Sequence, residues 1–167
     1  MCSMKDKYIV PANTRIGHVH LKVADLDRSL RFYSDLLGFE VSATYGNQAA
    51  FLSAGGYHHH IGLNTWHSEG SPPAHVNSVG LYHTAILYAT RKELATIYDR
   101  LREANYPLTS ASDHGVSEAL YLNDPDGNGV ELYWDRPKEI WPYNTDGSIE
   151  MFTKAIDLEG LLMELDP

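Results

Sequence analysis

The feature that most constrains the fold is an order of elements that occurs twice along the chain. In the first half, hydrophobic periodicity predicts a strand, a helix and three strands at 16–23, 25–37, 39–45, 49–54 and 58–66. In the second half it predicts the same order at 81–89, 90–105, 108–112, 117–122 and 130–134. His83 takes the place that His18 holds in the first half, 65 residues earlier (83 minus 18). The pattern predicts an α+β fold of two tandem βαβββ modules whose mixed sheets form a cleft.

The boundaries between these parts follow from composition. Proline and serine mark residues 69–78 as a linker between the two copies. We expect the following division: an N-terminal arm at 1–14, one domain at 15–136 with modules at 15–67 and 79–136, and a C-terminal extension at 137–167. The extension contains an acidic helix candidate at 157–165. It could pad the core, cover the site or contact a second subunit.

Charge and cysteine content exclude several classes of partner. The chain of 167 residues has a formal net charge of −9, and a surface that acidic repels phosphate backbones and anionic lipid. We therefore expect neither nucleic acid nor membrane as a partner. Cys2 is the single cysteine, so an intrachain disulfide and a thiolate metal cluster are excluded. No apolar run approaches the roughly 18–20 residues of a membrane span, and the sequence predicts a cytoplasmic globular protein.

The stretch from Ser117 to Trp134 carries the strongest chemical signal. It reads as two strands joined by a tight turn, because Pro125 fixes one φ angle and Gly127 and Gly129 permit positive φ. Glu131 lies between apolar neighbours in the second strand. Burying an unpaired carboxylate costs several kcal/mol, so this side chain must face water, an ion-pair partner or a metal.

Two of the nine histidines fall on one face of the first strand. Val19, Leu21 and Val23 alternate with polar residues, so a period of two places His18 and His20 together. In the run His58-His59-His60 the same alternation points the outer two one way and His59 the other. Two imidazoles and one carboxylate are the donors of the facial arrangement in non-haem Fe(II) oxygenases, and Mn²⁺, Zn²⁺ and Ni²⁺ accept the same donors.

At this point the sequence resembles a known family. Residues 17–38, Gly80-Leu-Tyr-His83 and Asn123-Asp-Pro-Asp-Gly-Asn-Gly-Val-Glu131 look like signatures of the vicinal-oxygen-chelate superfamily. This superfamily contains glyoxalase I, fosfomycin-resistance enzymes, bleomycin-binding proteins and type I extradiol dioxygenases. The resemblance covers roughly residues 15–136 and implies metal ligands at His18, His83 and Glu131.

Within this superfamily, residues 55–66, residues 112–121 and Asp135-Arg-Pro137 look most like the catechol-2,3-dioxygenase-like branch. By that resemblance His60 falls at the acid–base histidine and His59 at its neighbour. Tyr121, ten residues before Glu131, matches the tyrosine that binds a substrate oxygen at the metal, and His114 falls where a polar group lines the site. We also expect His20, His59, Tyr57, Trp66 and Trp134 as substrate contacts or cleft walls.

The resemblance implies a metal-dependent, most simply Fe(II)-dependent, extradiol dioxygenase that cleaves an aromatic vicinal diol with O₂. Its partners would be a small aromatic substrate, O₂ and a second copy of the chain in a homodimer. One alternative is a glyoxalase-like isomerase or thiol transferase, although the last strand of the first module offers no acid. The other is a metal-free drug- or metabolite-binding protein, whose relatives generally lack the three ligands.

Overall fold

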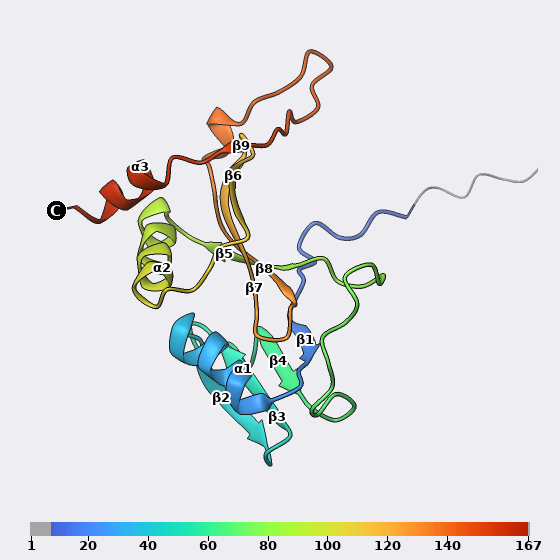
Figure 1. The fold of residues 1–167 in the computed structure, drawn as a ribbon. Coiled ribbons are helices and arrows are strands. Elements are labelled where there is room, and N and C mark those ends of the chain that lie inside the picture. Colours follow the sequence, from blue (N-terminus) through green and yellow to red (C-terminus); the bar gives the residue numbers. More distant parts are fainter. Residues whose placement is uncertain (1–7, 167) are drawn as a thin grey trace, which may run out of the picture.

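The computed structural model describes residues 8–166 and contains two separate sheets (Figure 1). The first sheet has the order β1–β4–β3–β2, with bounds Val19–Lys22, Ile61–Asn64, Ala49–Ser53 and Glu40–Tyr45. One helical segment connects β1 to β2; it begins as α1 (Leu26–Leu30) and widens into π-helical turns over Arg31–Leu36. The prediction of one helix here is confirmed, and only its change of winding was not foreseen.

The second sheet repeats this plan and adds a strand. Its order is β5–β8–β7–β6–β9, with bounds Thr84–Tyr88, Gly129–Asp135, Ser117–Asn123, Ser110–Asp113 and Lys154–Ala155. Between β5 and β6 runs α2 (Arg91–Glu103), which begins at the capping box of Thr90 and Glu93 that the sequence predicted. The remaining elements are the short helices Lys138–Ile140, α3 (Leu158–Leu162) and Met163–Leu165. The α+β class is confirmed.

The two copies correspond residue by residue at their first and last strands. β1 pairs in parallel with β4, and β5 pairs in parallel with β8. His18 lies directly before β1, as His83 lies directly before β5. Glu131 pairs with Ala85 in the second sheet, and the corresponding pair in the first sheet is Gly62 with His20. A Cβ at Gly62 would come within 2.9 Å of the His20 ring, so the imidazole fills the space that a side chain at 62 would need.

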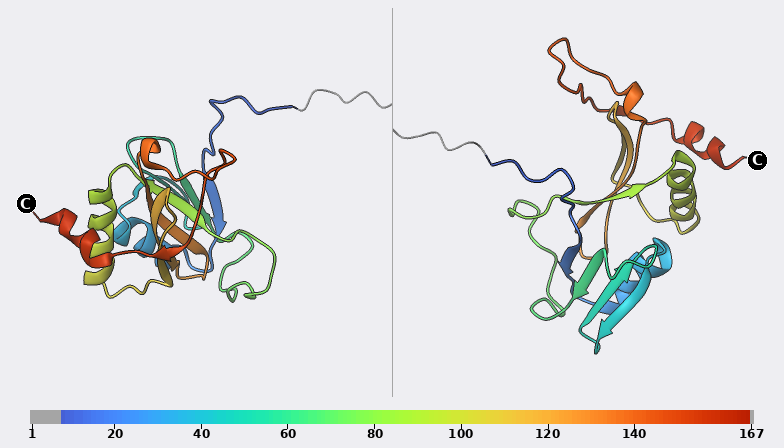
Figure 2. Two further views of the ribbon diagram at one scale, coloured as in Figure 1. Left: turned by 90° about the horizontal axis from the view of Figure 1, so that it is seen from above. Right: turned by 180° about the vertical axis from the view of Figure 1, so that it is seen from behind.

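The two modules are joined by the turn between β7 and β8, which reaches α1 (Figure 2). Asp124 is buried, and its side chain accepts from the backbone N–H groups of Asp126 and Asn128. It also accepts from the Tyr33 hydroxyl at 3.0 Å, while Asp126 pairs with Arg28 of α1 at 2.5 Å. The acidic turn therefore fixes the second module against the helix of the first.

The inner faces of the helices and sheets share one hydrophobic core. Its largest fully buried members come from both modules and from the extension: Tyr33, Leu52, Ile61, Leu63, Leu94, Leu101, Leu120, Leu122, Leu132 and Leu161. The predicted tail helix is present as α3, which lies beside α2 (Figure 1). Its Leu161 is fully buried, so the helix pads this core. Burial of a leucine side chain contributes about 1.5–3 kcal/mol.

Several local expectations need correction or fall outside the described residues. His58, His59 and His60 lie in a turn rather than in a strand, because β4 begins only at Ile61. Cys2 and the first half of the N-terminal arm lie outside the described part. Within that part, none of the helices has the length and apolar content to cross a membrane.

Candidate active site

His83 and Glu131 meet at the edge of the second sheet. Nε2 of His83 lies 3.0 Å from Oε2 of Glu131, and the two side chains are 30% and 12% exposed. Two atoms bound at right angles to one cation at about 2.1 Å are about 3.0 Å apart, so these two donors fit adjacent positions on a metal. Nδ1 of His83 is buried with no hydrogen-bond partner among the described residues. This nitrogen points away from Glu131, so a metal held between Nε2 and Oε2 would not contact it.

Tyr121 and His114 extend this pair into a series of four side chains. The Tyr121 hydroxyl donates to Oε1 of Glu131 at 2.9 Å, and Nε2 of His114 lies 2.8 Å from the same hydroxyl. Tyr121 and Glu131 are a directly opposed pair of β7 and β8. Burial, and then the hydrogen bond and charge of Glu131, raise the pKa of Tyr121 above its ordinary value, so the phenol stays protonated at neutral pH.

A cavity of about 690 Å³ lies between the two modules. Residues from the start of both copies line it, together with a tyrosine of β8: His18, Val19, His60, His83, Leu87 and Tyr133. β1 and β5 are the edge strands of their sheets, and both contribute residues to this cavity. The predicted cleft between the modules is therefore present, and it contains three of the predicted site histidines.

His18 does not reach the other two predicted ligands in this arrangement. Within residues 8–166, no three His, Cys, Asp or Glu side chains are close enough to hold one metal ion. The ring of His18 instead lies 4.4 Å from that of His59, centroid to centroid. The structure thus brings His83 and Glu131 together in one sheet and leaves His18 across the cavity.

The three consecutive histidines do not form a strand, and Nδ1 of His58 lies 2.7 Å from Nδ1 of His59. The rings of His58 and His60 both lie against Tyr57, at 4.0 and 4.8 Å, and the ring of His59 faces Phe51 at 5.0 Å. Nδ1 of His60 accepts from the backbone N–H of Ala54 at 3.3 Å, so the proton of the neutral ring is on Nε2. Burial and the neighbouring charge of His18 lower the pKa of His59.

The residues predicted as substrate contacts or cleft walls do not line the cavity between the modules: His20, Tyr57, His59, Trp66 and Trp134. The ring of His20 lies 5.8 Å from Trp66, and burial followed by the charge of His18 lowers the His20 pKa. Trp134, in contrast, packs against the hydrophobic core on the face of β8 opposite Glu131. Its neighbour Tyr133 lines the cavity instead. The sequence contained this signal, because residues 131 and 133 share a face of the strand.

A second, smaller cavity of about 420 Å³ opens on the other side of His83. His83, Tyr121 and His114 line it, with hydroxyl side chains from β6 and from the extension such as Ser112 and Thr153. No sequence pattern indicated Thr153, because this residue lies far beyond the duplicated modules. Of the four linked side chains, only His83 lines both cavities, whereas Tyr121 and His114 line the smaller one.

Comparison with known proteins shows which family the sequence matches. The sequence model described as "Glyoxalase/Bleomycin resistance protein/Dioxygenase superfamily" matches residues 15–132. The chain belongs to this superfamily. The matched region includes His18, His83, Tyr121 and Glu131, and it ends before the C-terminal extension.

Two curated members of the superfamily and one solved structure illustrate the likeness. The chain is 44% identical over 156 residues to a catechol-2,3-dioxygenase of Bacillus subtilis, covering 91% of this chain and 52% of the relative. It is 35% identical over 133 residues to a biphenyl-2,3-diol 1,2-dioxygenase of Rhodococcus globerulus, covering 77% and 69%. The chain thus spans about half the length of the first of these. A glyoxalase/dioxygenase structure from Nostoc punctiforme superposes with a TM-score of 0.62 at 18% identity, covering 80% of this chain and 99% of that one, and supports the fold alone.

Proposed function

We propose that the protein is a metal-dependent extradiol dioxygenase that cleaves an aromatic vicinal diol with O₂. The observation that carries this proposal is the Tyr121 hydroxyl hydrogen-bonded to the His83–Glu131 pair. It combines two metal donors with a neutral phenol that can donate to a substrate oxygen beside them. The identity to a catechol-2,3-dioxygenase supports the same reaction.

The resident metal would be Fe(II), held by His83 and Glu131 with His18 as the third ligand. When bound, Fe(II) would supply the redox chemistry that O₂ requires and the charge that makes a diol hydroxyl more acidic. His18 lies across the cavity from His83, and the shared core and the buried turn fix the two modules on each other, so the third donor would come from a second copy of the chain. A homodimer is part of this proposal for that reason.

The remaining side chains would transfer protons and position the substrate. Tyr121 would hydrogen-bond a substrate oxygen, assisted by His114. His60 lines the cavity, and its neutral ring would accept a proton on Nδ1 once the 3.3 Å bond from the Ala54 N–H opens. The imidazolium formed in this way would then return a proton from Nε2. His20, His59, Tyr57 and Trp66 would contact the ring of the substrate.

A glyoxalase-like reaction is disfavoured by the register of the first sheet. The position equivalent to Glu131 is Gly62, and its Cβ space is filled by the His20 ring. The first module therefore cannot supply a second carboxylate at the equivalent point. The donor set stays at two imidazoles and one carboxylate, which leaves positions free for a diol and O₂.

The test is anaerobic purification of the full chain, iron analysis, and oxygen uptake with a panel of catechols. We expect about one iron per site and catechol-dependent uptake that yields a ring-opened product. Isomerisation of a hemithioacetal without oxygen uptake would establish the glyoxalase-like alternative. Tight binding of an aromatic ligand without any divalent metal would establish the binding protein.

A further inference from the structure

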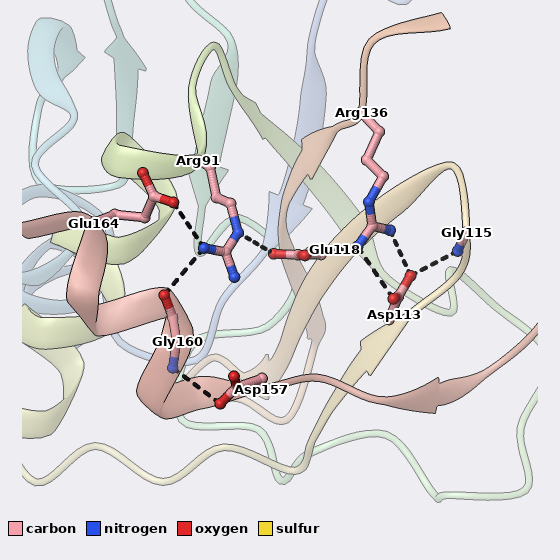
Figure 3. Close-up of polar contacts among 8 residues, drawn as sticks. All are labelled: Arg91, Asp113, Gly115, Glu118, Arg136, Asp157, Gly160 and Glu164. Carbon is pink, nitrogen blue, oxygen red and sulfur yellow. Dashed lines mark hydrogen bonds and ion pairs between the residues drawn. The ribbon is translucent and has the colours of Figure 1, made fainter. Parts of the chain in front are cut away.

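The C-terminal extension, which lies outside the residues that the family model matches, is built firmly into the second module. Arg91 of α2 donates to the Gly160 carbonyl at 3.1 Å and to Glu164 at 2.8 Å, which ties the tail helices to α2 (Figure 3). β9 adds to the sheet beside β6, where Ser112 pairs with Ala155 and Asp113 with Lys154. Both ends of the segment between Lys154 and Glu164 are therefore anchored.

Two residues of this extension, Phe152 and Thr153, contact the ring of His114. Nδ1 of His114 lies 2.8 Å from the Phe152 carbonyl oxygen, and the Thr153 hydroxyl is 3.4 Å from the same nitrogen. The backbone N–H of Phe152 also donates to the His114 carbonyl, at 3.4 Å. The His114 ring is thus placed between the extension on one side and Tyr121 on the other.

The backbone around His114 is shaped to admit the extension. Gly115 has φ of +81°, and a Cβ there would come within 2.7 Å of the Phe152 ring and 2.9 Å of Pro142. Asp113, on the other side of His114, accepts from Arg136 at 2.5 and 3.1 Å and from the Gly115 N–H at 2.8 Å (Figure 3). Neither neighbour of His114 can move without breaking these contacts.

The Phe152 carbonyl determines which nitrogen of His114 faces the site. A carbonyl oxygen has no proton to donate, so the proton in this contact belongs to Nδ1 of His114. Nε2 is then the nitrogen that faces the Tyr121 hydroxyl.

We propose that the C-terminal extension is a positioning part of the site: the Phe152 carbonyl fixes the ring of His114, which in turn orients the Tyr121 hydroxyl between His114 and Glu131. Thr153 completes the wall of the smaller cavity beside them. The effect on turnover rests on the proposed dioxygenase function, whereas the placement of His114 does not.

The first experiment is ¹⁵N NMR of the histidine side chains in the full-length protein, without added metal. We expect the His114 ring to carry a hydrogen-bonded proton on Nδ1, and a His114→Asn spectrum assigns the signal. A ring protonated on Nε2 alone would overturn the proposal, because it could not donate to the Phe152 carbonyl.

Two substitutions then separate the contacts of His114. Asparagine places an amide N–H close to the position of Nδ1 and keeps the bond to Phe152, whereas glutamine reaches toward Nε2 and keeps the bond to Tyr121. We expect hydrogen exchange of residues 152–155 to become about 10-fold faster in His114→Gln and to stay within about twofold in His114→Asn. The exposed His67→Gln is the matched control. Equal exchange in the two His114 variants would overturn the proposal.

A third variant loosens the extension at a distance from the site. Glu164→Ala removes one contact of Arg91, and Glu159→Ala on the same helix is its control. We expect Glu164→Ala to speed exchange of residues 152–155 and to lower kcat on a catechol about 10-fold, with KM and iron content nearly unchanged. Unchanged exchange, or faster exchange with an unchanged kcat, would contradict the proposal. If the wild type cleaves no catechol, the proposed function fails, and the NMR and exchange results still decide whether the extension positions His114.

Discussion

The hydroxyl of Tyr33, in the helix of the first module, donates to the carboxylate of Asp124, in the turn of the second, at 3.0 Å. Both residues are buried, and they are 91 positions apart. This bond, with the ion pair of Arg28 and Asp126, sets how the two modules sit on each other and hence where His18 stands relative to His83.

We expect Tyr33→Phe to lower the free energy of unfolding by about 1–3 kcal/mol, because Asp124 loses a buried donor. Urea denaturation measures the change. Tyr45→Phe, at an exposed tyrosine of β2, is the control and should change the value by less than about 0.5 kcal/mol. An equal effect of the two substitutions would show that the Tyr33 hydroxyl contributes nothing to stability.

The second prediction concerns alkaline pH. Burial, and then the charge of Glu93, raise the pKa of Tyr88 from its ordinary value of 10.0 to about 12. A raised pKa means that the native state favours the protonated phenol, so this contribution to stability is complete below pH 10 and is lost as the pH rises toward 12. We expect the unfolding free energy of the wild type to fall in this window by up to about 1.4 kcal/mol per pH unit more than that of Tyr88→Phe. If the unfolding free energies of the two proteins changed equally with pH in this window, the prediction for Tyr88 would be refuted.

The third prediction concerns metal binding. His83→Ala and Glu131→Ala should each lower the affinity for a divalent cation at least about 10-fold, because each removes one of two adjacent donors. Isothermal titration with Co²⁺ under anaerobic conditions measures this without turnover. His67→Ala, at an exposed histidine, should bind like the wild type. Unchanged affinity in His83→Ala would remove this residue from the site.

The fourth prediction separates proton transfer from metal binding. His60→Ala should keep the cation affinity of the wild type and lose about 10²–10⁴-fold in kcat, because His60 lines the cavity but would not be a ligand. Oxygen uptake on the best catechol gives kcat, and the Co²⁺ titration checks the site. Normal turnover in His60→Ala would show that another group exchanges the proton.

The fifth prediction concerns the ion pairs that Arg136 forms with Asp113 and Glu118. Glu118 is buried and accepts from Arg91 at 2.8 Å and from Arg136 at 2.7 Å (Figure 3). We expect Arg136→Met to destabilise the protein by about 3 kcal/mol, because Glu118 and Asp113 both lose a charged donor. Arg102→Met, which breaks an exposed pair with Asp99, should cost less than about 1 kcal/mol.

The same variant should change the response to acid. Burial of Asp113 acts to raise its pKa, but the hydrogen bonds from Arg136 and Gly115 outweigh burial and hold the pKa below its ordinary value of 3.8. This contribution to stability is present above pH 3.8 and is lost as the pH falls further. Arg136→Met should therefore lose less of its remaining stability below pH 4 than the wild type does, as urea titrations at pH 3 and 5 would show. A loss as steep as that of the wild type would exclude Arg136 as the cause.

Local sequence patterns were sufficient for most elements of the two modules and for part of the site, but not for β9 or for residues 58–60. The turn at 123–129 sets the register of β7 against β8, and this register alone places Tyr121 opposite Glu131. The capping box of Thr90 and Glu93 gave the start of α2 for the same reason, since the residues that decide it are neighbours. The equivalence of His18 and His83 followed from the duplication, although the two strands that were predicted to contain them begin one residue later.

The packing of distant parts decided the rest. The bond between His114 and Phe152 joins residues 38 apart through a backbone carbonyl, a group that every residue carries and that no sequence pattern distinguishes. The placement of His18 across the cavity from His83 depends on how two sheets rest on a shared core, and periodicity describes only the faces within each sheet. By itself the sequence determined the duplicated order of elements and the register that places Tyr121 opposite Glu131, because turn chemistry and duplication are local or repeated patterns. Only the tertiary structure decided which distant side chains meet, because contacts between modules depend on the shapes of surfaces formed after each module has folded.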